Sequence, residues 1–86
     1  MGSRSFDGVT FRVHSNDHEP RHVHAQLAET TVIIDLLVSG NVKLADRPNP
    51  IRPPNAKRSD VRKALNVAAE RFEELELLWE KTHGTT

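Results

Sequence analysis

Residues 14–24 read HSNDHEPRHVH and contain four of the five histidines of the chain, beside an aspartate and a glutamate. Imidazole nitrogens and carboxylates bind transition metals, and imidazole also transfers protons near neutral pH. This stretch is therefore where the sequence could carry chemistry, either at a metal ion or by acid–base catalysis.

A metal site is the first interpretation. His22 and His24 are two residues apart, so on a strand their side chains share one face with Cα atoms about 6.5–7 Å apart. Both could then reach one zinc ion at about 2.0–2.1 Å. The metal-ligand candidates are His18, His22 and His24, with Asp17 as another third ligand and His14 as a fourth. No cofactor is expected by default, and zinc or another divalent transition metal is the alternative.

An enzyme is the second interpretation. Two or three imidazoles with Arg12 and Arg21 could hold a phosphate and move a proton. The catalytic candidates are Arg12, His14, Asp17, His18, His22 and His24. Cysteine and tyrosine are absent, and no activated nucleophile is recognisable.

A polar turn without chemistry is the third interpretation. Asn16 and Asp17 would close the turn on backbone amides, Pro20 would stiffen it, and His18 or His22 would bind a carbonyl. This explains the Asn-Asp-x-x-Pro part better than it explains His22 and His24. The fourth interpretation is a recognition surface for another protein.

Four strands are expected to position these residues, at about 9–14, 22–27, 31–38 and 42–44. Apolar and polar residues alternate in VTFRVH and HVHAQL, the period of half-buried strands, and TVIIDLLV is the strongest strand. Residues 46–57 contain four of the five prolines, which predicts a rigid loop without regular structure.

One long helix is expected at about 60–83, after Ser59 or Asp60 as N-cap and before Gly84. Its apolar stripe consists of Val61, Leu65, Ala68, Phe72, Leu75 and Trp79. The predicted fold is α+β: a three- to four-stranded antiparallel sheet with one long C-terminal helix packed on one face, forming a single domain over residues 1–86.

This arrangement predicts an open second face of the sheet. The helix would cover the face that carries Phe11, Val23 and Ile34. The opposite face would display Arg12, His14, His22, His24, Gln26 and Asp35, together with Ile33 and Leu37. The imidazoles of His22 and His24 would both project away from the helix.

The charges sum to zero, but they are unevenly distributed. Seven of the twelve lysines and arginines lie in residues 43–63. The candidates for binding an anion or a partner are Arg21, Arg47, Arg52, Lys57, Arg58, Arg62 and Lys63. Cations at the start of a helix and glutamates toward its end oppose the helix dipole, so these cations could instead serve to bind an anion or a partner. The alternative is a solvated cluster that Asp60 offsets and salt screens. Leu77 lies off the apolar stripe, and with Leu78 it suggests a homodimer.

Composition limits the other classes of function. The longest apolar run, near residues 32–38, is too short to span a bilayer, so no membrane partner is expected. Without cysteine, disulfides and thiolate chemistry are excluded, and the cytoplasm is the expected compartment. Nucleic acid is a weaker alternative as partner, because no DNA- or RNA-binding motif is recognisable.

The stretch SNDHEPRHVHA resembles the signature of a prokaryotic family of small proteins, domain-of-unknown-function family 4160. The matching residues are Ser15, Asn16, Asp17, His18, Pro20, His22, Val23 and His24. The C-terminal helix with Trp79 is similar too. The resemblance implies a bacterial or archaeal intracellular protein, often encoded beside another small protein as in a toxin–antitoxin pair, and it implies no established reaction.

We therefore expect a small cytoplasmic interaction module, one component of a toxin–antitoxin-like pair, whose partner is a small protein encoded nearby. Its histidine-rich sheet face and basic loop would be the working surfaces. The alternative is a histidine-dependent metalloprotein or nuclease-like enzyme acting on phosphate-containing substrates.

Overall fold

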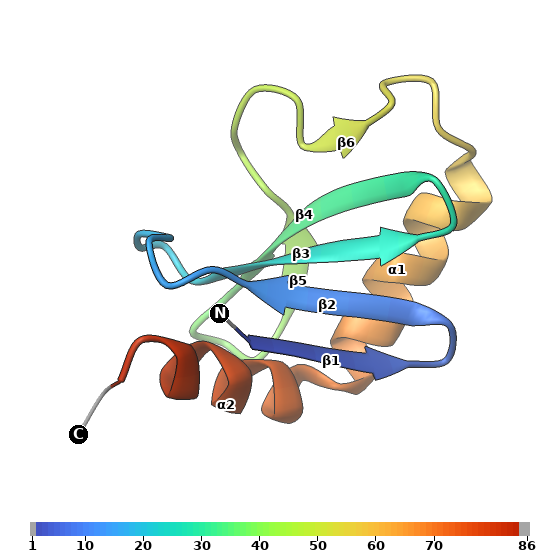
Figure 1. Ribbon diagram of the computed structural model, residues 1–86. Coiled ribbons are helices and arrows are strands. Elements are labelled where there is room, and N and C mark those ends of the chain that lie inside the picture. Colours follow the sequence, from blue (N-terminus) through green and yellow to red (C-terminus); the bar gives the residue numbers. More distant parts are fainter. Residues whose placement is uncertain (1, 85–86) are drawn as a thin grey trace.

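A computed structural model describes residues 2–84 of the chain; residues 1, 85 and 86 of the expected domain lie outside the described residues. Six strands and two helices follow one another (Figure 1): β1 (Gly2–Phe6), β2 (Val9–Val13), β3 (His22–Leu27), β4 (Thr30–Leu36), β5 (Val42–Leu44), β6 (Ile51–Arg52), α1 (Arg58–Glu70) and α2 (Phe72–Thr82). The strands form one antiparallel sheet in the order β1-β2-β3-β4-β5, and β6 also pairs with β4. The α+β prediction is confirmed, but the predicted strand number is too small.

The additional edge strand β1 was not expected from the sequence. It pairs with β2 from Gly2 opposite Val13 to Phe6 opposite Val9. Asp7 and Gly8 connect the two strands with positive φ angles of 51° and 82°, as a tight two-residue hairpin requires. The Asp-Gly pair was the signal that could have revealed this hairpin. The sequence of β1 itself gave no such signal, because its central residues are all exposed and show no alternation of apolar and polar side chains.

The proline-rich loop also contains regular structure, so that prediction is wrong. Ile51 and Arg52 form β6 and pair with Val32 and Thr31 of β4. The N–H of Ile33 donates to the carbonyl of Pro50 at 2.8 Å. Proline lacks an N–H but keeps its carbonyl as an acceptor, so a proline-rich segment can still bind a strand edge.

The C-terminal helical segment is two helices, which corrects the prediction of one long helix. α1 begins at Arg58 after Lys57, so neither Ser59 nor Asp60 is the N-cap. The helices meet at Arg71, where φ is −109°. Gly84 has a φ of 59° just beyond α2, which confirms its role as a stop.

The division at Arg71 lets one helical segment follow a twisted sheet. α1 packs against β3, β4 and β5, whereas α2 packs against β1, β2 and β3 (Figure 1). The division also places Glu73 and Glu74 in the first turn of α2 and Lys81 in its last turn. These charges complement the dipole of α2. The prediction that the glutamates oppose the helix dipole is therefore wrong for Glu73 and Glu74.

The core lies between the helices and the sheet face that the sequence assigned to it. It is formed by Val9, Phe11, Val13, Val23, Ala25, Val32, Ile34, Leu36, Ala64, Val67, Ala68, Leu75, Leu78 and Trp79. β4 ends at Leu36 rather than at residue 38, and Val38 is 98% exposed.

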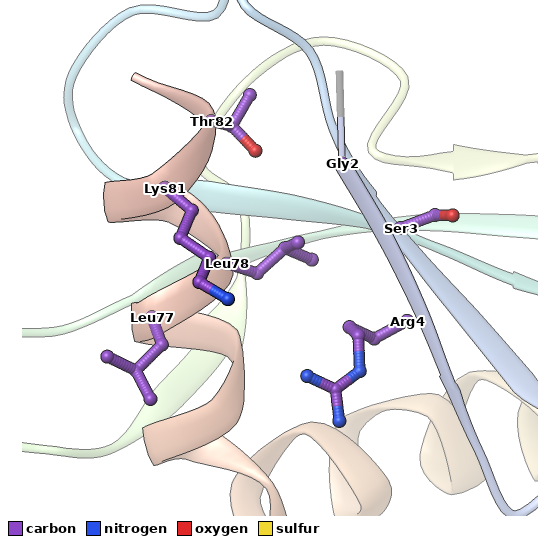
Figure 2. Close-up of a pocket in the computed structure, with 7 residues that line it drawn as sticks. All are labelled: Gly2, Ser3, Arg4, Leu77, Leu78, Lys81 and Thr82. Carbon is purple, nitrogen blue, oxygen red and sulfur yellow. The ribbon is translucent and has the colours of Figure 1, made fainter. Parts of the chain in front are cut away.

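Leu77 and Leu78 have opposite surroundings. Leu78 is buried and points toward β1, whereas Leu77 is 57% exposed and points away from it (Figure 2). A Cβ atom on Gly2 would come within 2.7 Å of Leu78 Cδ1, so a glycine permits the close approach of β1 to α2. Leu78 is therefore unavailable for the expected contact between two copies, and Leu77 remains.

Candidate functional site

The loop between β2 and β3 is closed by Asp17. Its Oδ2 atom accepts a hydrogen bond from the N–H of His14 at 3.0 Å, and its own N–H donates to the carbonyl of His14 at 3.0 Å. This confirms the expected role of Asp17 in closing the turn. It also fixes the direction of the carboxylate, because one of its oxygens is bound to the backbone.

His22, the first residue of β3, is buried beneath α2. Its exposed fraction is 2%, and its ring centroid lies 5.4 Å from that of Trp79. The expectation that its imidazole projects to the exterior is wrong. The helical segment changes direction at Arg71, and α2 then packs against β3 as well as against β1 and β2. The Nδ1 atom of His22 lies 2.9 Å from the carbonyl oxygen of Pro20. A carbonyl only accepts, so Nδ1 is the donor, and in the neutral ring Nε2 carries a lone pair.

The two imidazoles of β3 converge on Asp17. The Nε2 atom of His22 lies 3.6 Å from Asp17 Oδ1, and the Nε2 atom of His24 lies 3.4 Å from Asp17 Oδ2. One ligand atom from each residue lies within 4.8 Å of the others. Both Nε2 atoms are buried and have no hydrogen-bond partner in the described part of the chain. The three residues therefore present a compact set of donor atoms.

The third member of this set is Asp17 and not His18. His18 is exposed in the loop, so its selection as a metal-ligand candidate is not supported. His14 lies on the more exposed side, where its ring centroid is 4.9 Å from that of His24. It is placed to approach a group held by the other three.

The charges of the site suit a cation. Burial alone would raise the pKa of Asp17, but the His14 N–H bond and the nearby imidazoles outweigh it and hold that pKa below 3.8. Burial lowers the pKa of His24 below 6.5 despite the neighbouring carboxylate of Asp17. At neutral pH the site therefore contains an ionised carboxylate and a neutral imidazole, the forms that bind metals.

His83, which was not among the candidates, supports the loop from the other end of the chain. Its Nε2 atom lies 2.9 Å from the backbone oxygen of Asp17, and its Nδ1 atom lies 2.9 Å from that of Trp79. Its ring stacks on Trp79 with centroids 3.9 Å apart. Nothing in the sequence pattern pointed to His83, because it lies outside the histidine-rich stretch.

The second face of the sheet is less open than expected. The loop before β6 binds Ile33, and Asp35 is buried at 6% exposure between its cross-strand neighbours His22 and Lys43. Arg12 and Gln26 are exposed and joined by a hydrogen bond. The structure thus confirms exposure for Arg12 and Gln26 and contradicts it for His22 and Asp35.

The seven cations expected to bind an anion or a partner do not gather at the histidines. Arg21 forms an ion pair with Glu76 of α2 and lies above the ring of Phe72, so it fastens the loop to the helix. The remaining six are exposed. Arg52 lines a small hollow with His24, and Arg47 lines another with Asp35. Lys57 lies near Glu29, and Lys63 lies near Gly8. Arg58 and Arg62 flank a groove on α1.

Comparison with known proteins gave one match. The family model described as "Domain of unknown function (DUF4160)" matches residues 8–80, which include the whole histidine cluster. No curated protein and no solved structure matches the chain. Among the described residues, neither helix is long and apolar enough to cross a bilayer.

Proposed function

Because this chain belongs to the DUF4160 family, whose description assigns no activity, we propose from its own geometry that it binds a divalent transition metal through Asp17, His22 and His24. One observation carries the proposal. Two buried Nε2 atoms without hydrogen-bond partners face the two oxygens of one carboxylate. The Nε2 atom of His22 carries a lone pair in the neutral ring, and a lone pair that faces a carboxylate oxygen is unfavourable unless a cation or a proton lies between them.

The donor set favours zinc among common metals. Two imidazole nitrogens and one carboxylate are typical zinc ligands, and the fourth position would go to water or to His14. The bond from His22 Nδ1 to the Pro20 carbonyl is the kind of outer contact that fixes a metal-binding imidazole. The present separations of 3.4 and 3.6 Å would shorten only slightly around an ion bound at about 2.0–2.1 Å.

The surroundings support a structural role for the metal. The nitrogen donors are shielded from solvent, and the site joins the loop to β3 beneath Trp79. A metal bound there would stabilise the fold by linkage, since the unfolded chain lacks the assembled site. The enzymatic alternative, action on phosphate-containing substrates, additionally requires a coordination position open to substrate.

Metal analysis of protein purified without an affinity tag tests the proposal. We expect about one zinc per chain by mass spectrometry of the dialysed protein. His22→Gln and His24→Gln should each lose most of it. His18→Ala is the matched control, since it removes an exposed histidine of the same loop and should retain the metal. Metal-free wild-type protein that also fails to bind added zinc would refute the proposal.

We also propose that the chain is an interaction module with a small neighbouring protein as partner, in a toxin–antitoxin-like pair. The support is a hollow beside the buried Asp35, whose lining includes the exposed cations Lys43 and Arg47. These cations could bind carboxylates of a partner. Co-expression with the product of the adjacent gene should give a complex that Arg47→Glu weakens, and recovery of the chain alone would count against it.

A further inference from the structure

An apolar groove with a basic rim lies between α1 and the segment that follows β6. Its volume is about 580 Å³, and its lining includes Ile51, Pro54, Val61, Leu65, Arg58 and Arg62. We call it the α1 groove. Figure 1 shows how the chain leaves β6 and returns to the start of α1. Val61 and Leu65 pack against the core but are only partly buried, so part of each side chain lines the α1 groove.

The charge of the α1 groove is unbalanced. Arg58 and Arg62 are one helical turn apart on the same face of α1, and both are exposed. No carboxylate belongs to the lining. An occupant should therefore combine an apolar side chain for the floor with carboxylates for the rim.

The outer face of α2 has this combination. Leu77 is 57% exposed and, with Val38, is one of two large hydrophobic residues found exposed within residues 2–84. Glu73 lies four residues earlier on the same face, and Glu80 lies three residues later. Both glutamates are exposed. Lys81 lies four residues later, so Leu77 is flanked by both signs of charge, with the two glutamates in excess. An apolar anchor at helical spacing from charged residues is a known pattern for docking a helix into a groove.

We propose that the outer face of α2, centred on Leu77, docks into the α1 groove of a second copy of the chain. This inference does not depend on the metal site. The arginine rim limits the geometry of the contact. Two grooves would bring arginines together, whereas the glutamates of α2 complement the rim, so each contact joins unlike surfaces of two copies. Such contacts close into a ring or a reciprocal dimer, or extend into a chain.

Sedimentation of the full chain with two complementary variants tests the proposal. Arg58→Glu/Arg62→Glu destroys the groove rim and leaves α2 intact, whereas Leu77→Lys destroys the anchor and leaves the groove intact. We expect wild-type mass to rise between about 10 µM and about 1 mM protein. Each variant alone should remain monomeric, with association weakened at least about tenfold. A mixture of the two should form a one-to-one complex, because one intact groove meets one intact α2 face.

Val38→Lys is the matched control, since it removes the other exposed hydrophobic residue and should associate like the wild type. Circular dichroism checks that every variant is folded. Three results would overturn the proposal: a monomeric wild type at all concentrations, association of Leu77→Lys equal to that of the wild type, or no complex in the mixture. A monomer that binds an acidic amphipathic peptide would assign the groove to a different partner.

Discussion

The Nε2 atom of His83, just beyond α2, lies 2.9 Å from the backbone oxygen of Asp17, a residue 66 positions earlier in the chain. Asp17 is thus held from two sides, by His14 through its side chain and by His83 through its carbonyl. His83 therefore contacts the backbone of the residue whose carboxylate faces the two imidazoles, and we expect this contact to position the candidate metal site.

Replacing His83 should loosen the loop. His83→Phe keeps a ring to stack on Trp79 but removes the ring nitrogens that face the carbonyl oxygens of Asp17 and Trp79, so the free energy of unfolding should fall by about 1–3 kcal/mol. Zinc affinity should fall by about 10–100-fold, as for other groups that support metal ligands. Urea denaturation and zinc titration measure the two effects. A His83→Phe variant equal to wild type in both would show that the contact with Asp17 does not position the site.

Two substitutions of Asp17 should separate its role in the turn from its charge. Asp17→Asn keeps an oxygen that can accept the His14 N–H, so metal-free stability should stay close to wild type. Asp17→Ala also loses that bond, which should cost about a further 1 kcal/mol. Both should bind zinc at least about tenfold more weakly. Equal zinc affinity in Asp17→Asn and wild type would exclude the carboxylate as a ligand.

Arg21 and Glu76 should be coupled energetically. Their side chains are 19% and 35% exposed, so solvent screens the ion pair and a double-mutant cycle should give about 0.2–1 kcal/mol. Arg21→Ala should destabilise more than Glu76→Ala, because Arg21 also contacts the carbonyl of Leu37 and the ring of Phe72. A coupling energy of zero, measured by urea denaturation, would show that this ion pair does not stabilise the contact between the loop and α2.

The metal-free protein should lose stability on acidification. Burial holds the pKa of His24 below 6.5, so the unfolded chain binds more protons than the folded chain just below that pH. Stability from this group is complete above pH 6.5 and falls as the pH decreases below it. The pKa of Asp17 is held below 3.8, so its contribution is lost only in more acidic solution.

Thermal unfolding in the presence of a chelator measures this effect. The midpoint temperature should decrease between about pH 7 and pH 5, and His24→Gln should reduce that decrease. A variant with the same pH profile as the wild type would contradict the assignment to His24.

The sequence by itself determined the fold class, the core face of the sheet and the place of the candidate site. Alternation in VTFRVH and HVHAQL set the strands and buried Phe11 and Val23, because side chains alternate across a strand. The spacing of His22 and His24 predicted that both imidazoles share one face of a strand. The polar residues before them predicted a turn that contains Asp17. These are local properties, which depend on residues close together in the chain.

Only the tertiary structure decided which residues complete the site and how deeply it is buried. The turn at Arg71 brings Trp79 over His22 and His83 to Asp17, which no pattern within residues 14–24 could indicate. The loop before β6 likewise covers Ile33 through backbone bonds that do not depend on side-chain type. Such contacts join residues far apart in the chain, so they follow from how the helices pack on a twisted sheet rather than from local periodicity.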